Sequence, residues 1–71
     1  MLTKALDYVK SEISFSKNEI NKMICKAMQM RCPVSLAYPN FANEIDNLLA
    51  DFCEDNECEF DFDIEEIIEN L

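Results

Sequence analysis

The chain has 71 residues and a net charge of −9, from 15 Asp and Glu residues against six Lys and Arg residues. It contains no glycine and no histidine. Without glycine, phosphate-cradling loops, Rossmann fingerprints and tight hairpin turns are disfavoured, and without histidine the commonest general base is missing. Apolar residues make up 49% of the chain, which is too many for a disordered acidic tail. We therefore expect one small, folded, all-α domain over residues 1–71.

The first two predicted helices carry apolar stripes, and the second has a clear start signal. Residues 2–13 repeat apolar side chains at the i, i+3/i+4, i+7 spacing of one helix face. Ser16 and Glu19 form a capping box, in which each side chain can accept a hydrogen bond from the other residue's backbone amide. A second helix is therefore predicted from Lys17, and Pro33 ends it.

The third predicted helix lies between two segments in which apolar residues alternate with other residues. These segments are residues 34–38 and residues 58–62. Each is either a short strand or an extended connector, and two strands joined by the intervening helix would pair in parallel. Pro39 opens that helix, its apolar face continues to Phe52, and Asp63 caps a last helix. The sequence thus predicts a bundle of about four helices and leaves a minor two-strand pairing open.

The cysteines are Cys25, Cys32, Cys53 and Cys58. Their spacings lack the two-residue knuckle that is typical of zinc sites. No apolar run is long enough for a signal peptide or a membrane span. We therefore expect free thiols in a reducing cytoplasm, with no metal, no cofactor and no membrane contact. A zinc site made of all four cysteines is the alternative.

Charge is divided unequally between the two halves of the chain. Residues 1–40 hold all six cations and three anions, whereas residues 41–71 hold twelve anions and no cation. Neighbouring carboxylates repel one another, which destabilises the folded state. Either this repulsion has no function, or the negative electrostatic potential that it reflects serves to attract a partner. One interpretation is a solvated surface that maintains solubility. The other is an acidic face that docks on a basic protein surface, since opposite potentials steer association.

The second interpretation leads to a function. Basic protein surfaces are mostly surfaces that bind nucleic acid, so an acidic face can act as a nucleic-acid mimic or an inhibitor. We predict a non-enzymatic binding module whose partner is a basic protein, for example one that handles nucleic acid. The predicted partner-binding residues are Asp46, Glu54, Asp55, Glu57, Glu59, Asp61, Asp63, Glu65 and Glu69. The alternative is a small accessory protein that forms homo-oligomers, with the acidic face serving solubility or head-to-tail packing.

Three other kinds of site are not predicted. Carboxylates from Asp55 to Glu66 follow the EF-hand spacing, but Phe60 stands where the calcium loop needs glycine. The second helix carries lysines and Arg31, but a chain with a net charge of −9 is repelled by phosphates, so direct nucleic-acid binding is not expected. Cys25 lies between two lysines, yet no histidine can act as its base, so no catalytic residue is predicted.

Overall fold

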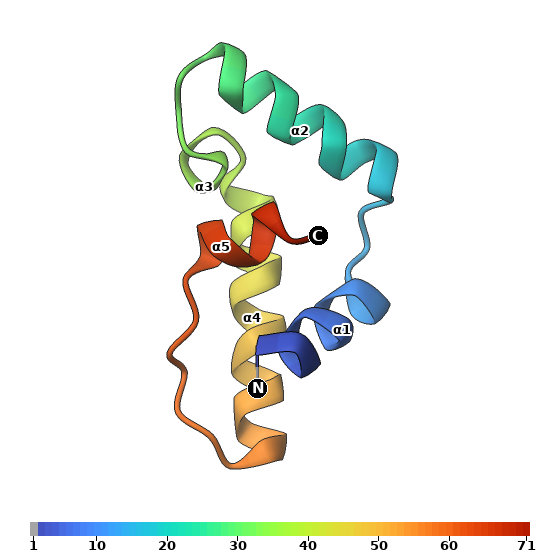
Figure 1. The fold of residues 1–71 in the computed structure, drawn as a ribbon, viewed down its shortest axis with the longest axis vertical. Coiled ribbons are helices and arrows are strands. Elements are labelled where there is room, and N and C mark those ends of the chain that lie inside the picture. The colour runs from blue at the N-terminus through green and yellow to red at the C-terminus, as the bar shows by residue number, and fades with distance from the viewer. Residues whose placement is uncertain (1) are drawn as a thin grey trace.

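The fold is built around one long helix, α4. The computed structural model describes residues 2–71. Its helices are α1 (Leu2–Glu12), α2 (Lys17–Gln29), α3 (Val34–Ala37), α4 (Pro39–Asn56) and α5 (Ile64–Glu69). Helices α1, α3 and α5 pack against α4, while α2 lies across one end of the molecule and packs on α3 (Figure 1). The all-α prediction is confirmed. No helix within residues 2–71 is long and apolar enough to cross a membrane.

The apolar stripes of the helices meet in one core. The buried side chains are Ala5, Val9, Ile20, Met23, Ala27, Val34, Phe41, Ile45, Leu49, Phe52, Cys53, Ile67 and Ile68. Every helix contributes to this core, and α4 contributes the most. Burial of a large apolar side chain stabilises the fold by about 1.5–3 kcal/mol, which is a large share of the stability of so short a chain.

The predicted helix starts are confirmed. Ser16 Oγ accepts from the Glu19 amide at 3.2 Å, and Glu19 Oε1 accepts from the Ser16 amide at 3.1 Å, which completes the capping box of α2. Pro39 occupies the first turn of α4, where its missing amide costs nothing. Asp63 caps α5 by accepting from the Glu65 amide at 3.0 Å. Each of these helix starts depends on residues that are only a few positions apart in the sequence.

Helices α2 and α4 both end on a left-handed residue that is not glycine. Arg31 has a φ of 53° and Glu57 a φ of 52°. The amide of Cys32 donates to the carbonyl of Ala27 at 3.0 Å, and an equivalent bond closes the end of α4. This hydrogen-bond pattern is the Schellman motif, whose left-handed position usually carries glycine.

The two-strand pairing that the sequence left open for residues 34–38 and 58–62 does not form, because residues 2–71 contain no strand. The first segment forms α3, in which the Pro33 carbonyl accepts from the amides of Leu36 and Ala37, both at 3.0 Å. The second segment is extended and runs beside α4 (Figure 1). A lone pair of strands is only marginally stable, whereas a helical turn satisfies its own amides. The bundle therefore has five helices in its described part rather than four.

Candidate docking groove

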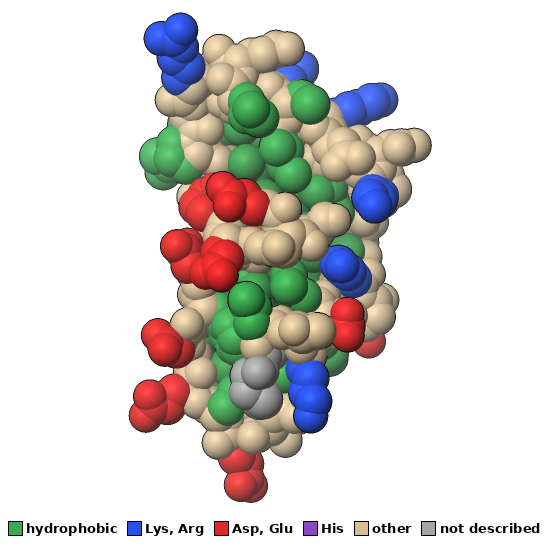
Figure 2. All heavy atoms as spheres, in the orientation of Figure 1, with side chains coloured by type: hydrophobic (Ala, Val, Ile, Leu, Met, Phe, Trp, Pro, Cys, Tyr) green, Lys and Arg blue, Asp and Glu red, His purple; other side chains and the backbone are tan. Residues whose placement is uncertain are grey.

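The charge split of the sequence is also a split of the molecular surface. Figure 2 shows Lys and Arg side chains along the top and right of one face, and most Asp and Glu side chains along its left and lower edges. The left edge in this orientation is where the chain runs from the end of α4 to α5 (Figure 1). On this face, most carboxylates thus lie along the side where the chain runs from α4 to α5, and we call this the acidic side.

A groove with carboxylates at its edge lies between α3, α4 and the start of α5, and we call it the acidic groove. Its volume is about 500 Å³. Its main apolar residues are Leu36, Phe62 and Ile64, and its carboxylates are Asp46, Asp63 and Glu65. The groove therefore combines an apolar contact surface with three negative charges contributed by two helices and the segment before α5.

Two of these carboxylates are held in place by backbone amides. Asp63 accepts from the Glu65 amide at 3.0 Å, and the Glu65 carboxylate accepts from the Ser35 amide at 3.0 Å. The second bond ties α5 to α3. Because an amide carries no net charge, these bonds orient the carboxylates without neutralising them. Asp46 is exposed on α4.

The apolar part of the groove combines one exposed and one anchored side chain. Leu36 is 72% exposed, although it is large and apolar. Phe62 is half-buried, and its ring lies 6.3 Å from that of Phe52. Sequence reasoning missed both residues, because their segments were considered only as short strands or connectors. A single exposed leucine is common on protein surfaces, so Leu36 is notable only because the structure places it beside Phe62 and Ile64 in the groove.

The other six predicted residues lie outside the groove. Two are in the last turns of α4, three follow it, and one is at the end of α5. They are Glu54, Asp55, Glu57, Glu59, Asp61 and Glu69, and all are exposed. The structure thus brings three of the nine predicted residues together and spreads the rest along the chain from the end of α4 onwards.

Glu44 is an acidic residue with a structural contact. Its carboxylate accepts from the Ser14 amide at 3.2 Å and from the Ser14 hydroxyl at 2.9 Å. These bonds tie the connection between α1 and α2 to the central helix. Glu44 therefore differs from the exposed carboxylates near the end of α4.

The thiols and carboxylates do not gather into a metal centre in the described residues, where no group of three or more ligating side chains could hold an ion. Asp55 belongs to α4, so the run from Asp55 to Glu66 does not form a calcium loop. All four cysteines are free. Burial raises the pKa of the Cys53 thiol, and the neighbouring Cys58 thiol raises it further. Cys53 is therefore a core residue with little thiolate character.

No family model, curated protein or solved structure matches the chain. Its function is therefore argued from the acidic groove and from the charges around it.

Proposed function

We propose that the protein is a non-enzymatic binding module whose acidic side docks on a basic surface of another protein. The observation that carries this proposal is the acidic groove, where Leu36 and Phe62 lie beside Asp46, Asp63 and Glu65. The groove would take an apolar side chain of the partner, and the carboxylates would meet the lysines or arginines around it.

Two physical effects support this assignment. The twelve carboxylates of residues 41–71 produce a negative field that attracts a basic surface and speeds its encounter. Once the partner is in contact, burial of Leu36 removes an exposed apolar side chain from water and slows dissociation. The field therefore governs the association rate, and the groove governs the lifetime of the complex.

The partner class that fits best is a protein that handles nucleic acid. Such proteins carry clustered lysines and arginines to neutralise phosphates. An acidic side without cations would compete with the nucleic acid for that surface. The protein would thus act as a nucleic-acid mimic or an inhibitor.

The field is tested by a charge-removing variant. Partners are captured at low salt and identified, and one is purified for kinetic measurement. Glu54→Gln, Glu57→Gln and Glu59→Gln together should slow its association and flatten the salt dependence of the rate. The control is Asp7→Asn with Glu12→Gln, which removes two carboxylates from the other half of the chain. An unchanged salt dependence in the triple variant would contradict docking by the acidic side.

The groove is tested separately by a pair of exposed apolar residues. Leu36 is 72% exposed in the groove, and Met28 is 73% exposed on α2. Leu36→Ser should raise the dissociation rate of the same partner about tenfold, whereas Met28→Ser should leave it unchanged. Equal effects of the two substitutions would show that the groove is not the contact site.

A further inference from the structure

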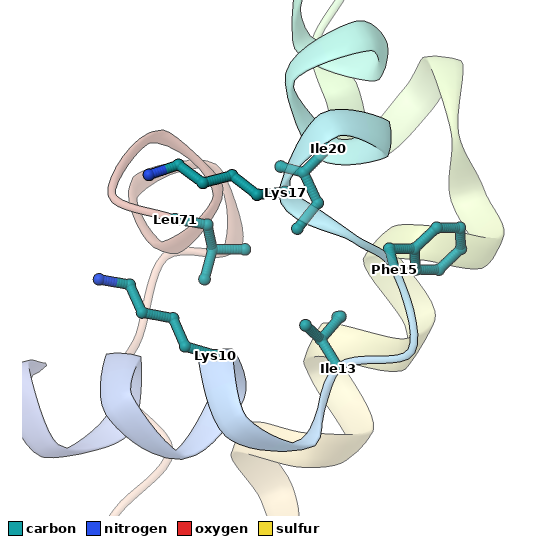
Figure 3. Close-up of a pocket in the computed structure, with 6 residues that line it drawn as sticks. All are labelled: Lys10, Ile13, Phe15, Lys17, Ile20 and Leu71. Atoms are coloured by element: carbon teal, nitrogen blue, oxygen red, sulfur yellow. The ribbon is translucent and has the colours of Figure 1, made fainter.

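A second hollow lies away from the acidic groove, where α1, the connection to α2 and the end of the chain meet. It has a volume of about 260 Å³. Ile13, Ile20 and Leu71 point toward one another across it, and the side chains of Lys10 and Lys17 extend on either side of Leu71 (Figure 3). The hollow is thus apolar inside and positively charged at its edge, and we call it the lysine hollow.

The chemical complement of the lysine hollow is present on the same chain. Phe60 is 42% exposed on the extended segment that follows α4, and its ring lies 6.2 Å from that of Phe62. Its neighbours Glu59 and Asp61 are both exposed. An aromatic side chain between two carboxylates matches an apolar hollow between two ammonium groups in both polarity and charge.

Phe60 and the lysine hollow lie on opposite sides of the molecule. The extended segment runs along one side of α4, whereas α1 and the connection to α2 lie on the other side (Figure 1). Phe60 therefore has no access to the hollow of its own chain. Lysine stems are long and flexible, so in a second copy their ammonium groups can reach the carboxylates on either side of an inserted Phe60.

We propose that the chain self-associates head to tail, with Phe60 of one copy inserted into the lysine hollow of the next. The two contact surfaces are different, so each added copy offers one free hollow and one free segment, and the assembly grows beyond a dimer into an open chain or, where the rotation between copies closes, a ring. The net charge of −9 on each copy opposes this association over long distances. Salt of about 0.15 M screens that repulsion beyond about 8 Å and leaves the contact pairs in place. Because the net charge of each copy still disfavours association, assembly should require high protein concentration.

Sedimentation velocity of the full chain over a range of concentrations tests this proposal. The average mass of the wild type should rise beyond that of a dimer. Phe60→Ala, and separately Lys10→Glu with Lys17→Glu, should weaken association at least about tenfold. The matched control is Lys22→Glu with Lys26→Glu, which makes the same charge change on the exposed face of α2 and should leave the contact intact. Circular dichroism establishes that each variant is folded.

Mixing experiments identify the two surfaces. The Phe60→Ala chain and the Lys10→Glu, Lys17→Glu chain should each be monomeric but form a dimer together, because the mixture contains one intact contact. A second mixture combines two charge-reversed chains. One carries Lys10→Glu with Lys17→Glu in the hollow, and the other carries Glu59→Lys with Asp61→Lys in the segment. Each chain alone should stay monomeric, and the two should form longer assemblies only when mixed. A wild type that stays monomeric at every concentration, or mixtures that do not associate, would overturn the proposal. Lys10→Glu with Lys17→Glu changes neither the acidic groove nor the exposed carboxylates that follow α4, so this variant lets the two proposals fail independently.

Discussion

Tyr8 has a pKa that burial and three nearby carboxylates raise. Its ring lies 5.9 Å from that of Phe52, at the edge of the core. Burial raises the pKa of Tyr8 above its ordinary value of 10.0, and the negative charges of Asp51, Glu12 and Asp55 raise it further. Both effects disfavour the phenolate in the folded protein.

Stability at alkaline pH should therefore depend on Tyr8. Because the folded state holds the phenol proton more tightly than the unfolded state, this contribution is fully present below pH 10.0. It is lost as the pH rises through the raised pKa. We expect the free energy of unfolding to fall as the pH rises above about 10, and to fall less steeply in Tyr8→Phe. Urea titrations at several pH values below and above 10 measure the free energy of unfolding of both proteins. The same decline with pH in wild type and Tyr8→Phe would contradict the prediction.

The left-handed ends of α2 and α4 are the most costly local feature of the helices. A residue with a Cβ atom in this conformation costs about 1–2 kcal/mol, and glycine avoids the clash. Glycine in turn loses more backbone entropy on folding, which offsets about 0.5–1 kcal/mol of the gain. The chain contains no glycine and accepts this cost at Arg31 and Glu57.

Replacing Arg31 by glycine should therefore stabilise the fold. We expect Arg31→Gly to raise the free energy of unfolding by about 0.5–1 kcal/mol. The control is Arg31→Gln, which removes the same charge but keeps the left-handed cost, and it should give no gain. Chemical denaturation of the two variants measures the difference. Equal gains in both would show that charge, not backbone conformation, is responsible.

At the scale of the whole molecule, the acidic side carries a cost in self-repulsion. Residues 41–71 contain no cation, and Glu54, Glu57 and Glu59 are exposed near one another in the chain. Repulsion between exposed carboxylates is strongest at low ionic strength, because added salt screens it. The folded state should thus be less stable in low salt than in moderate salt.

Changing Glu54, Glu57 and Glu59 to glutamine should leave the fold intact and raise its melting temperature. A gain of about 0.5 kcal/mol corresponds to about 2–4 °C in a domain of this size. The gain should shrink as salt is added. Glu44→Gln is the control: its carboxylate binds Ser14, so its loss should lower the melting temperature. A triple variant that unfolds would show that these carboxylates are paired within the fold.

The sequence by itself determined the helix starts, the all-α class and the division of charge. The capping box at Ser16, the cap at Asp63 and the proline at position 39 act through atoms a few residues away, so they are readable without the fold. The predicted first helix, residues 2–13, agrees with α1 to within one residue, because its apolar repeat spans three turns.

Only the tertiary structure decided the conformation of residues 34–37 and the sites that depend on it. Alternation over five residues does not distinguish a strand from one helical turn, and no neighbouring strand is placed to pair with this segment in the described residues. The acidic groove joins Leu36, Asp46 and Phe62, and the lysine hollow joins Lys10 to Leu71. These residues are far apart in the sequence, and what brings them together is packing around α4, which no local pattern encodes.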